Sequence, residues 1–450
     1  MPYLQAQVVH YRPRVSVLDK ELTTVSYHGL VNFLLLLLSA TLLRMAIENH
    51  LKYGILVSIP GSNVSLQDWM GTLAGMFAVV ISFFVAYTIE RSAIPSRDDI
   101  AGPVAADHPD RGDKARLVGI TMQERRTIIM HIFNLLFVLV APSCLTYFSI
   151  FQPALGTLVM ALACIMFLKL YSLAATNFDL RRAACINPAA TRLRPRIHYS
   201  VAYPNNVTLK NFGYFWLAPT LCYQPSYPRI PGPICKSFLA KRVAEFVIIG
   251  IAMYVLIQQY AVPTLVGSVH AIDTGNGFWL SERVLKLSVI SASVWFLGFY
   301  AIFHAGLNAL AEVLRFADRA FYLDWWNSVD LAAYWREWNL PIHYFCKRHI
   351  MMPLVSAPLS LPAGVGVMVT FLVSAIMHEL LFGIPTHCLK GYSFIGMMMQ
   401  IPLIQLTQWL VKWRGPDSGL GNAVFWISFC IVGQPLGVVQ YYYTWVKNNP

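Results

Sequence analysis

A histidine and a glutamate stand side by side in one of the most apolar stretches of the chain. His378 and Glu379 lie in FLVSAIMHELLFGIP, where Ser374 is the nearest other polar residue. On a helix, successive residues point about 100° apart, so the two ionisable side chains leave on different faces, whereas Ser374 shares the face of His378. Burial favours the neutral imidazole, which can act as a general base. Each residue has two possible roles at this point. His378 is either a base or a structural residue that bonds a neighbouring helix. Glu379 either orients His378 or is a hydrogen-bonded buried carboxyl.

A second group of polar residues recurs at helical spacing. His304, Asn308 and Glu312 follow one another every four residues, so on a helix they form a stripe that runs toward Arg315 and Arg319. Polar stripes in membrane helices usually bond one helix to another. We therefore expect a structural role for this stripe.

Two amide side chains stand close to prolines. Asn339 and His343 lie on either side of Pro341 in WNLPIH. Asn is a good helix N-cap and Pro favours the first helical turn, so capping and substrate contact are both compatible with this motif. Gln434 precedes Pro435 in IVGQPLG, inside an apolar stretch, where it marks either a helix kink or a binding group.

The composition of the chain requires a membrane around it. Of the 450 residues, 56% are apolar and only 12% are charged, and the mean hydropathy is +0.53. Soluble domains carry about 25% charged residues, and a helix needs about 20 mainly apolar residues to cross the hydrocarbon core. Nine segments meet this requirement: 29–48, 70–90, 128–150, 152–173, 243–265, 287–309, 362–383, 391–411 and 422–445. We therefore predict an all-α polytopic membrane protein with about nine transmembrane helices.

The basic residues are distributed unevenly between the two sides of these spans. If the N-terminus is cytosolic, the cytosolic segments hold 27 of the 34 Lys and Arg residues. The net charge of +12 is then explained by membrane topology, and we expect no nucleic-acid partner. Nine spans place the C-terminus in the lumen. The sequon at Asn63 then faces the lumen, whereas the one at Asn206 faces the cytosol and stays unmodified.

Two cytosolic segments differ in kind. Residues 95–118 are rich in Pro, Gly, Asp and Arg, which is typical of a flexible loop. Residues 310–350 are dense in Trp and Tyr, side chains that favour the membrane interface, so we expect an amphipathic aromatic segment on the cytosolic leaflet. The predicted organisation is a cytosolic N-terminal segment, 1–28, followed by a single membrane-embedded domain, 29–450. The eight cysteines form no C-x-x-C pair, and H-E-x-x-H, G-x-S-x-G and P-loop motifs are absent, so the sequence gives no metal or nucleotide signal.

Six motifs in order resemble the sterol and diacylglycerol acyltransferase branch of the membrane-bound O-acyltransferase family. One of them is HAGLNALAEVLRFADRAFY, which runs into FYxDWWN, formed by Phe321, Tyr322, Asp324, Trp325, Trp326 and Asn327. The others are APTLCYQPSYPR, WREWNLPIHYFCKRH, SAIMHE, GMMMQIPL and GNAVFWIS…GQP, the last ending at Gln434. The proline in WNLPIH, together with CKRH and LCY, makes the chain more similar to the type 1 diacylglycerol acyltransferases than to the sterol enzymes.

The resemblance implies a fold, a reaction and a set of site residues. It implies the fold of the family and transfer of a long-chain acyl group from acyl-CoA to diacylglycerol in the endoplasmic reticulum membrane, with no metal and no resident cofactor. His378 would be the catalytic base, Asn339 would lie near the reacting groups, and Glu379 would support the histidine. The residues implied in binding acyl-CoA and diacylglycerol are Trp335, Trp338, His343, Ser374, Met397, Gln400 and Gln434. For Asp324, Trp325 and Trp326 we expect a structural role at the cytosolic entrance.

Several points stay open at the level of sequence. The basic residues usual after the HxxxxRH segment are missing, since neither Lys nor Arg occurs between Arg348 and Lys390. The CoA phosphates are then met by Lys347 and Arg348 or by the 174–242 loop. The acceptor could be a sterol or a long-chain alcohol, and a non-enzymatic lipid transporter is the remaining class. A homodimer or homotetramer is expected from the resemblance alone.

Overall fold

A computed structural model describes residues 28–62, 64–95, 111–186, 201–356 and 359–448. The chain divides into two compact units, Met1–Val57 and Ser58–Pro450, so the first span falls outside the unit that holds the other eight. Throughout the described ranges the regular elements are helices, and the one isolated β-bridge joins Arg229 to Phe316. Most of the predicted N-terminal segment 1–28, and Asn63 of the first sequon, lie outside the described residues.

Nine helices or continuous helical runs in the described part of the chain are long and apolar enough to span a membrane, as predicted. They are Val31–Tyr53, Leu66–Ser92, Met122–Ser149, Pro153–Ala184, Lys236–Asp273, Gly277–Leu314, Ala363–Gly383, Tyr392–Arg414 and Leu420–Asn448. Several are longer than predicted. The fifth and sixth each run for 38 residues, about 57 Å at 1.5 Å per residue, against a hydrocarbon core of about 30 Å.

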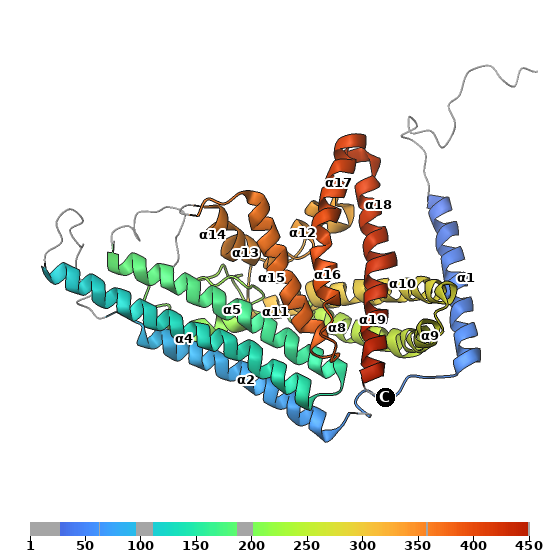
Figure 1. Cartoon of the computed structure of the whole chain (residues 1–450), viewed down its shortest axis with the longest axis horizontal. Coiled ribbons are helices and arrows are strands. Elements are labelled where there is room, and N and C mark those ends of the chain that lie inside the picture. The colour runs from blue at the N-terminus through green and yellow to red at the C-terminus, as the bar shows by residue number, and fades with distance from the viewer. Residues whose placement is uncertain (1–27, 63, 96–110, 187–200, 357–358, 449–450) are drawn as a thin grey trace, which may run out of the picture. The chain divides into compact units, whose positions relative to one another are not determined.

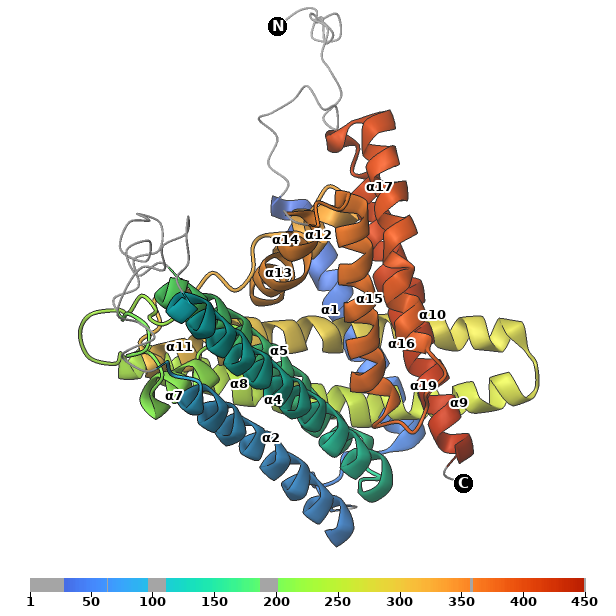
Figure 2. The ribbon, with the colours of Figure 1, turned by 60° about the vertical axis from the view of Figure 1, so that its left-hand side comes forward.

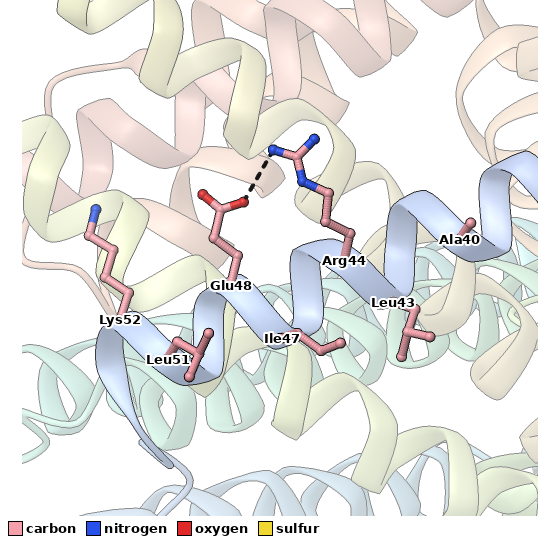
Figure 3. A pocket seen from close by; sticks show the side chains of 7 residues that line it. All are labelled: Ala40, Leu43, Arg44, Ile47, Glu48, Leu51 and Lys52. Carbon is pink, nitrogen blue, oxygen red and sulfur yellow. Dashed lines mark ion pairs between the residues drawn. The ribbon is translucent and has the colours of Figure 1, made fainter.

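The first unit contributes one described helix, α1 (His28–Tyr53), which is apolar on all sides. Arg44 and Glu48, one turn apart, form an exposed ion pair of 3.6 Å on it. A shallow hollow along this helix, from Ala40 to Lys52, is lined by α1 alone (Figure 3). None of the predicted site residues belongs to α1, so the search for a site concerns the second unit.

Three long helices lie side by side at one end of the second unit (Figures 1 and 2). These are α2 (Leu66–Ser92), α4 (Arg111–Ser149) and α5 (Pro153–Ile186). The turn between α4 and α5 is held by Asp68, whose Oδ1 accepts hydrogen bonds from the N–H groups of Phe151 (2.6 Å) and Gln152 (3.1 Å). Because α4 begins at Arg111, the last part of the predicted 95–118 loop is helical, while residues 96–110 lie outside the described ranges. Extending an existing helix costs much less free energy than nucleating a new one. The polar sequence that begins at Arg111 can therefore continue the helix of the span.

A short helix is docked on α5 by a buried lysine. In α7 (Leu209–Leu217) the last carbonyls have no intrahelical partner, as at every helix C-terminus. The Lys169 ammonium donates to the carbonyl oxygens of Phe215, Trp216 and Ala218 at 2.9, 2.9 and 2.7 Å. A cation at the negative end of the helix dipole satisfies these groups and positions the segment that follows α7.

Two further spans form a long antiparallel pair, which runs crosswise to the C-terminal helices (Figure 2). One consists of α8 (Lys236–Leu256), η2 (Ile257–Ala261) and α9 (Val262–Asp273), the other of α10 (Gly277–Phe299), η3 (Tyr300–Gly306) and α11 (Leu307–Leu314). The aromatic segment then folds into short helices. They are η4 (Trp325–Asn327), α12 (Leu331–Glu337), α13 (Leu340–Cys346), η5 (Lys347–Met351) and α14 (Met352–Val355).

The C-terminal helices pack as a group near the aromatic segment. They are α15 (Ala363–Gly383), α16 (Tyr392–Met398), α17 (Gln400–Arg414), α18 (Leu420–Trp426), η7 (Ile427–Gly433) and α19 (Gln434–Asn448). The spans predicted at 362–383, 391–411 and 422–445 are therefore α15, α16 with α17, and α18 with η7 and α19.

Three of the π-helical segments have a local cause. A proline follows η2, η5 and η7 by two residues: Pro263, Pro353 and Pro435. A proline in a helix lacks its N–H and clashes with the carbonyl four residues earlier, and in each case that carbonyl lies inside the π-helical segment. Widening the helix to the π form moves the carbonyl away. Gln434 and Pro435, where a kink was one of the two alternatives, thus directly follow a π-helical segment, a feature frequent at functional sites.

Candidate active site

The predicted base lies on a helix face that is packed against the aromatic segment. Phe371, Ser374, Ala375 and His378 recur at helical spacing on α15, and Phe371 and Ala375 are buried against Met397 of α16. The Trp335 ring of α12 packs against the same cluster, 5.6 Å from the Phe371 ring centroid and perpendicular to it. Ser374, Met397, Trp335 and His378, four of the predicted site residues, therefore come from three elements that meet at one place.

The orientation of His378 determines which ring nitrogen is available. Nδ1 lies 2.8 Å from the Ser374 carbonyl oxygen and 3.4 Å from the Ser374 hydroxyl. Because a carbonyl oxygen can only accept, Nδ1 of the neutral ring carries the proton and donates it to Ser374. Nε2 then keeps its lone pair. The half-buried imidazole is thus held by its own helix in the tautomer that a base requires.

The hydrogen bonds of Glu379 bear on the two interpretations that the sequence left open. Its Oε1 accepts from the N–H of Gly391 at 2.9 Å, and its Oε2 accepts from the N–H groups of Ser393 (3.1 Å) and Phe394 (3.2 Å). The Tyr441 hydroxyl donates to the same Oε2 at 3.0 Å. The group that orients His378 is therefore the Ser374 carbonyl, whereas Glu379 ties α15 to the start of α16 and to α19. These are the contacts of a half-buried, hydrogen-bonded carboxyl, the second of the two interpretations given above.

Asn339 is the N-cap of α13. Its Oδ1 accepts from the N–H of Ile342 at 3.1 Å, and Pro341 occupies the first turn, as the motif allowed. Asn339 is buried, and His343 lies one turn further along the same short helix, half buried. Burial, together with the positive charges of Lys347 and Arg336, lowers the pKa of His343. His343 packs beside the Tyr344 ring, with centroids 5.9 Å apart.

The two predicted glutamines differ in their surroundings. Gln400, at the start of α17, donates from Nε2 to the carbonyl of Gly396 in the preceding turn at 3.1 Å. Gln434 begins α19, directly after η7, and its buried Oε1 has no protein donor among the described residues. A buried amide oxygen without a donor costs free energy unless a ligand or water supplies one. Gln434 therefore fits a binding group better than Gln400 does.

The FYxDWWN residues form a structural core with an exposed rim. Trp325 is fully buried, with its ring centroid 5.2 Å from that of Trp295 and 5.0 Å from that of Phe299. Phe321 is also buried and Tyr322 half buried, whereas Asp324, Trp326 and Asn327 are exposed, and Trp338 lies in the same aromatic cluster as Trp325.

The loop after this motif is held against two of the C-terminal helices. Asn422 of α18 donates to the carbonyls of Trp326 and Ser328, both at 3.0 Å. The Thr407 hydroxyl of α17 accepts from the N–H of Leu331 at 3.2 Å. At Gly421 a Cβ atom would lie 2.1 Å from the Val329 carbonyl oxygen, so only glycine permits this close approach of helix and loop.

The polar stripe on the sixth span bonds neighbouring segments, as expected. His304 Nδ1 lies 2.8 Å from the Tyr322 hydroxyl, and Asn308 donates to the His304 carbonyl. Glu312 accepts from the N–H of Cys235 and from the Arg319 guanidinium, both at 2.6 Å. The stripe thus joins the helix to the FYxDWWN motif and to the start of α8.

Of the two basic residues directly after α13, Lys347 and Arg348, one makes hydrogen bonds within the protein. Arg348 donates to the Tyr223 carbonyl at 3.1 Å and to the Thr176 hydroxyl at 3.2 Å, whereas Lys347 is exposed. Of these two, Lys347 is the better candidate for the CoA phosphates. His349 Nε2 lies 2.7 Å from the Ser172 hydroxyl, whose oxygen accepts from the N–H of Tyr223.

Because His349 is held neutral, the stability of the fold is expected to depend on pH. Burial, with the neighbouring Arg348 guanidinium, lowers the pKa of His349 to about 4. Between pH 4 and the unfolded value of about 6.5 the unfolded chain binds more protons than the folded one, so stability falls as the pH is lowered through this window, by at most about 3 kcal/mol. Thermal unfolding in detergent is expected to show a larger decrease in Tm between pH 7.5 and 5 for the wild type than for His349→Gln. Equal decreases would contradict this assignment.

Several buried polar residues were not found from the sequence. Glu90 is fully buried between α2, α4 and α5, with one oxygen 2.9 Å from His131 Nε2 and the other 2.9 Å from the Arg181 guanidinium. Asn206 of the second sequon is buried too, and donates to Asn177 and Tyr223. The one available signal was His131, an ionisable residue inside the third predicted span. Within the described ranges, no group of three His, Cys, Asp or Glu residues is arranged to hold a metal ion.

Comparisons with known proteins give the family of the chain. Residues 193–439 match the model of MBOAT, the membrane-bound O-acyltransferase family. The chain is 35% identical to diacylglycerol O-acyltransferase 1C of Glycine max, covering 98% of the chain and 80% of the relative. It is 36% identical to diacylglycerol O-acyltransferase 1 of Arabidopsis thaliana, covering 98% and 78%, and 35% identical to diacylglycerol O-acyltransferase 1 of Dictyostelium discoideum, covering 97% and 65%. The chain therefore belongs to the membrane-bound O-acyltransferase family.

Proposed function

We propose that this enzyme transfers a long-chain acyl group from acyl-CoA to the free hydroxyl of 1,2-diacylglycerol, forming triacylglycerol and CoA. The family supports acyl transfer to oxygen. The names of the three relatives support diacylglycerol as the acceptor, since their similarity extends over 97–98% of this chain. A sterol or a long-chain alcohol is the alternative acceptor.

His378 is the general base in this proposal. The observation that carries it is the 2.8 Å contact between Nδ1 and the Ser374 carbonyl, which leaves Nε2 unprotonated. Nε2 takes the proton of the acceptor hydroxyl as its oxygen attacks the thioester carbonyl. An ester bond forms, the carbon–sulfur bond breaks, and the imidazolium returns the proton to the CoA thiolate. The step is balanced without a metal or a resident cofactor.

The surrounding residues supply binding and orientation. Trp335, Ser374 and Met397 lie where α12, α15 and α16 meet, and Trp338 packs against the Trp335 ring at 6.0 Å between centroids. The apolar side chains of this group suit the apolar chains of the substrates. We assign His343 and Gln400 to its periphery. Gln434 offers its buried oxygen as an acceptor. Since Oδ1 of Asn339 accepts the helix-cap bond, a contact of Asn339 with substrate is made by its Nδ2 donor.

The membrane determines where the substrates meet. The polyanionic head of acyl-CoA stays in the cytosol. In the predicted membrane orientation of the protein, most Lys and Arg residues lie on that side and provide positive charge. We propose the endoplasmic reticulum membrane as the location, with a cytosolic N-terminus, a lumenal C-terminus and a homodimeric or homotetrameric assembly. A water-excluding site at membrane depth would limit hydrolysis of the thioester.

A competition between acceptors tests the proposed reaction. Microsomes from yeast that lack neutral-lipid synthesis are made to express the chain and receive labelled oleoyl-CoA with diacylglycerol, sterol and fatty alcohol together. Labelled triacylglycerol is expected as the main product. Steryl or wax ester as the main product would agree with acyl transfer to oxygen but contradict diacylglycerol as the acceptor. The absence of any labelled ester would favour a lipid transporter.

A further inference from the structure

The helix that begins at Gln434 is anchored to the neighbour of the proposed base. Gln434 and Tyr441 are seven residues apart on α19, which puts them on one face of the helix, two turns or about 10 Å apart. The Tyr441 hydroxyl lies 3.0 Å from Glu379 Oε2, and Glu379 follows His378 on α15. One hydrogen bond therefore links the helix that carries the base to the helix that begins with Gln434.

The contact has a fixed direction. A carboxylate oxygen only accepts, so the single phenolic proton of Tyr441 goes to Glu379, and the phenol oxygen accepts from the N–H of Ser393 at 2.9 Å. The Ser393 hydroxyl lies 2.8 Å from the same oxygen, and the Tyr392 ring packs edge-on against the Tyr441 ring at 5.5 Å. Hydrogen bonds to charged groups are among the stronger ones, so this contact holds α15, α16 and α19 in one arrangement.

Tertiary contacts determine the register of α19: Val439 packs it against α9 and α10, and the Tyr441 bond joins it to α15. The preceding segment, η7, is π-helical from Ile427 to Gly433, and the wider turn adds a residue to the helix register. The register of α18 therefore does not by itself determine where Gln434 points. Among the hydrogen bonds of the described residues, the one that joins α19 to α15 is the bond from Tyr441 to Glu379.

We propose that Tyr441 is a positioning residue of the acyl-transfer site: by binding Glu379 it sets where Gln434 lies relative to His378. This inference rests on the proposed function, because it assumes that His378 and Gln434 serve the reaction. Tyr441 does not itself contact the reacting groups in this account. Its loss is expected to misplace a substrate-orienting group, an effect that appears in kcat more than in KM for acyl-CoA.

The chain offers a matched control for the hydroxyl. Tyr443, two residues further along α19, also donates to a carboxylate, at 3.0 Å from Asp273, but at the far end of the α9–α10 hairpin. Tyr441→Phe and Tyr443→Phe each remove one hydroxyl–carboxylate bond and keep the ring. Both are purified in detergent, folded enzyme is quantified by size exclusion and thermal unfolding, and kcat and KM are measured for each.

Tyr441→Phe is expected to lower kcat per folded enzyme about tenfold with KM for oleoyl-CoA within about twofold, while Tyr443→Phe keeps the kcat of the wild type. In a Gln434→Ala background, Tyr441→Phe is expected to cause no further decrease in kcat, because Tyr441 acts through the Gln434 side chain, which that variant already lacks. Equal kcat values for the two tyrosine variants, or a loss that multiplies with that of Gln434→Ala, would overturn the inference. His378→Ala with wild-type activity would instead reject the proposed base, whatever Tyr441→Phe does.

Discussion

Replacing His378 by alanine is expected to lower kcat for triacylglycerol formation about a thousandfold, with little change in the amount of folded enzyme. A positioned general base contributes about 10²- to 10⁴-fold to a reaction of this type. The side chain is only half buried and its hydrogen bonds are to its own helix, so its removal breaks no hydrogen bond between helices in the described part of the chain. The measurement is the rate of labelled triacylglycerol formation by the purified variant.

A second histidine variant controls for general effects of the substitution. His270, near the end of α9, is exposed and lies beside the Trp279 ring, at 5.9 Å between centroids. His270→Ala is expected to keep wild-type kcat and Tm. If His378→Ala retains more than about a tenth of the wild-type rate, His378 is not the base. If it loses activity together with its folded fraction, the loss reflects folding and the assignment also fails.

Glu90→Ala is expected to destabilise the group of α2, α4 and α5 more than any surface substitution. Removing the carboxylate leaves the buried Arg181 guanidinium without its counter-charge, which typically costs about 3–5 kcal/mol. His131 loses its partner as well. We expect thermal unfolding in detergent to show a decrease in Tm on the order of 10 °C.

Two further variants isolate the cause of this effect. Glu48→Ala removes an exposed carboxylate that pairs with Arg44, and such a pair contributes little, so its Tm is expected to match the wild type. Replacing both members of the buried pair, as Glu90→Leu with Arg181→Met, removes the uncompensated charge and is expected to recover most of the lost Tm. A double variant as unstable as Glu90→Ala would show that shape, not charge, determines the stability here.

The spans were predictable because a single property decides them. About 20 apolar residues must be adjacent in sequence for a helix to cross the hydrocarbon core, so the nine segments could be read directly. The cap at Asn339 was also foreseeable, since a capping residue and its helix are neighbours in the chain. The aromatic segment was recognised for the same reason, because interfacial Trp and Tyr residues cluster locally.

The contacts that organise the site were not predictable, because they join distant parts of the chain. Glu379 is bonded to residues 12 to 62 positions away, and no local pattern marks Tyr441, a residue type common at membrane interfaces. Glu90 lies near the end of its span, where a charge normally faces water, and only the packing of α4 and α5 shows that it is buried. The role proposed for His378 could be predicted from its residue type and its apolar surroundings in the sequence, whereas the group that orients its ring could not.

The most direct test of the central claim is the stoichiometry of the reaction in the purified chain. Oleoyl-CoA and a diacylglycerol are supplied in detergent, and released CoA thiol and triacylglycerol are measured in the same samples. We expect one triacylglycerol per CoA, strict dependence on diacylglycerol, and the loss of both products in His378→Ala. Release of CoA without triacylglycerol, or equal product from the wild type and His378→Ala, would contradict base-catalysed acyl transfer by this site.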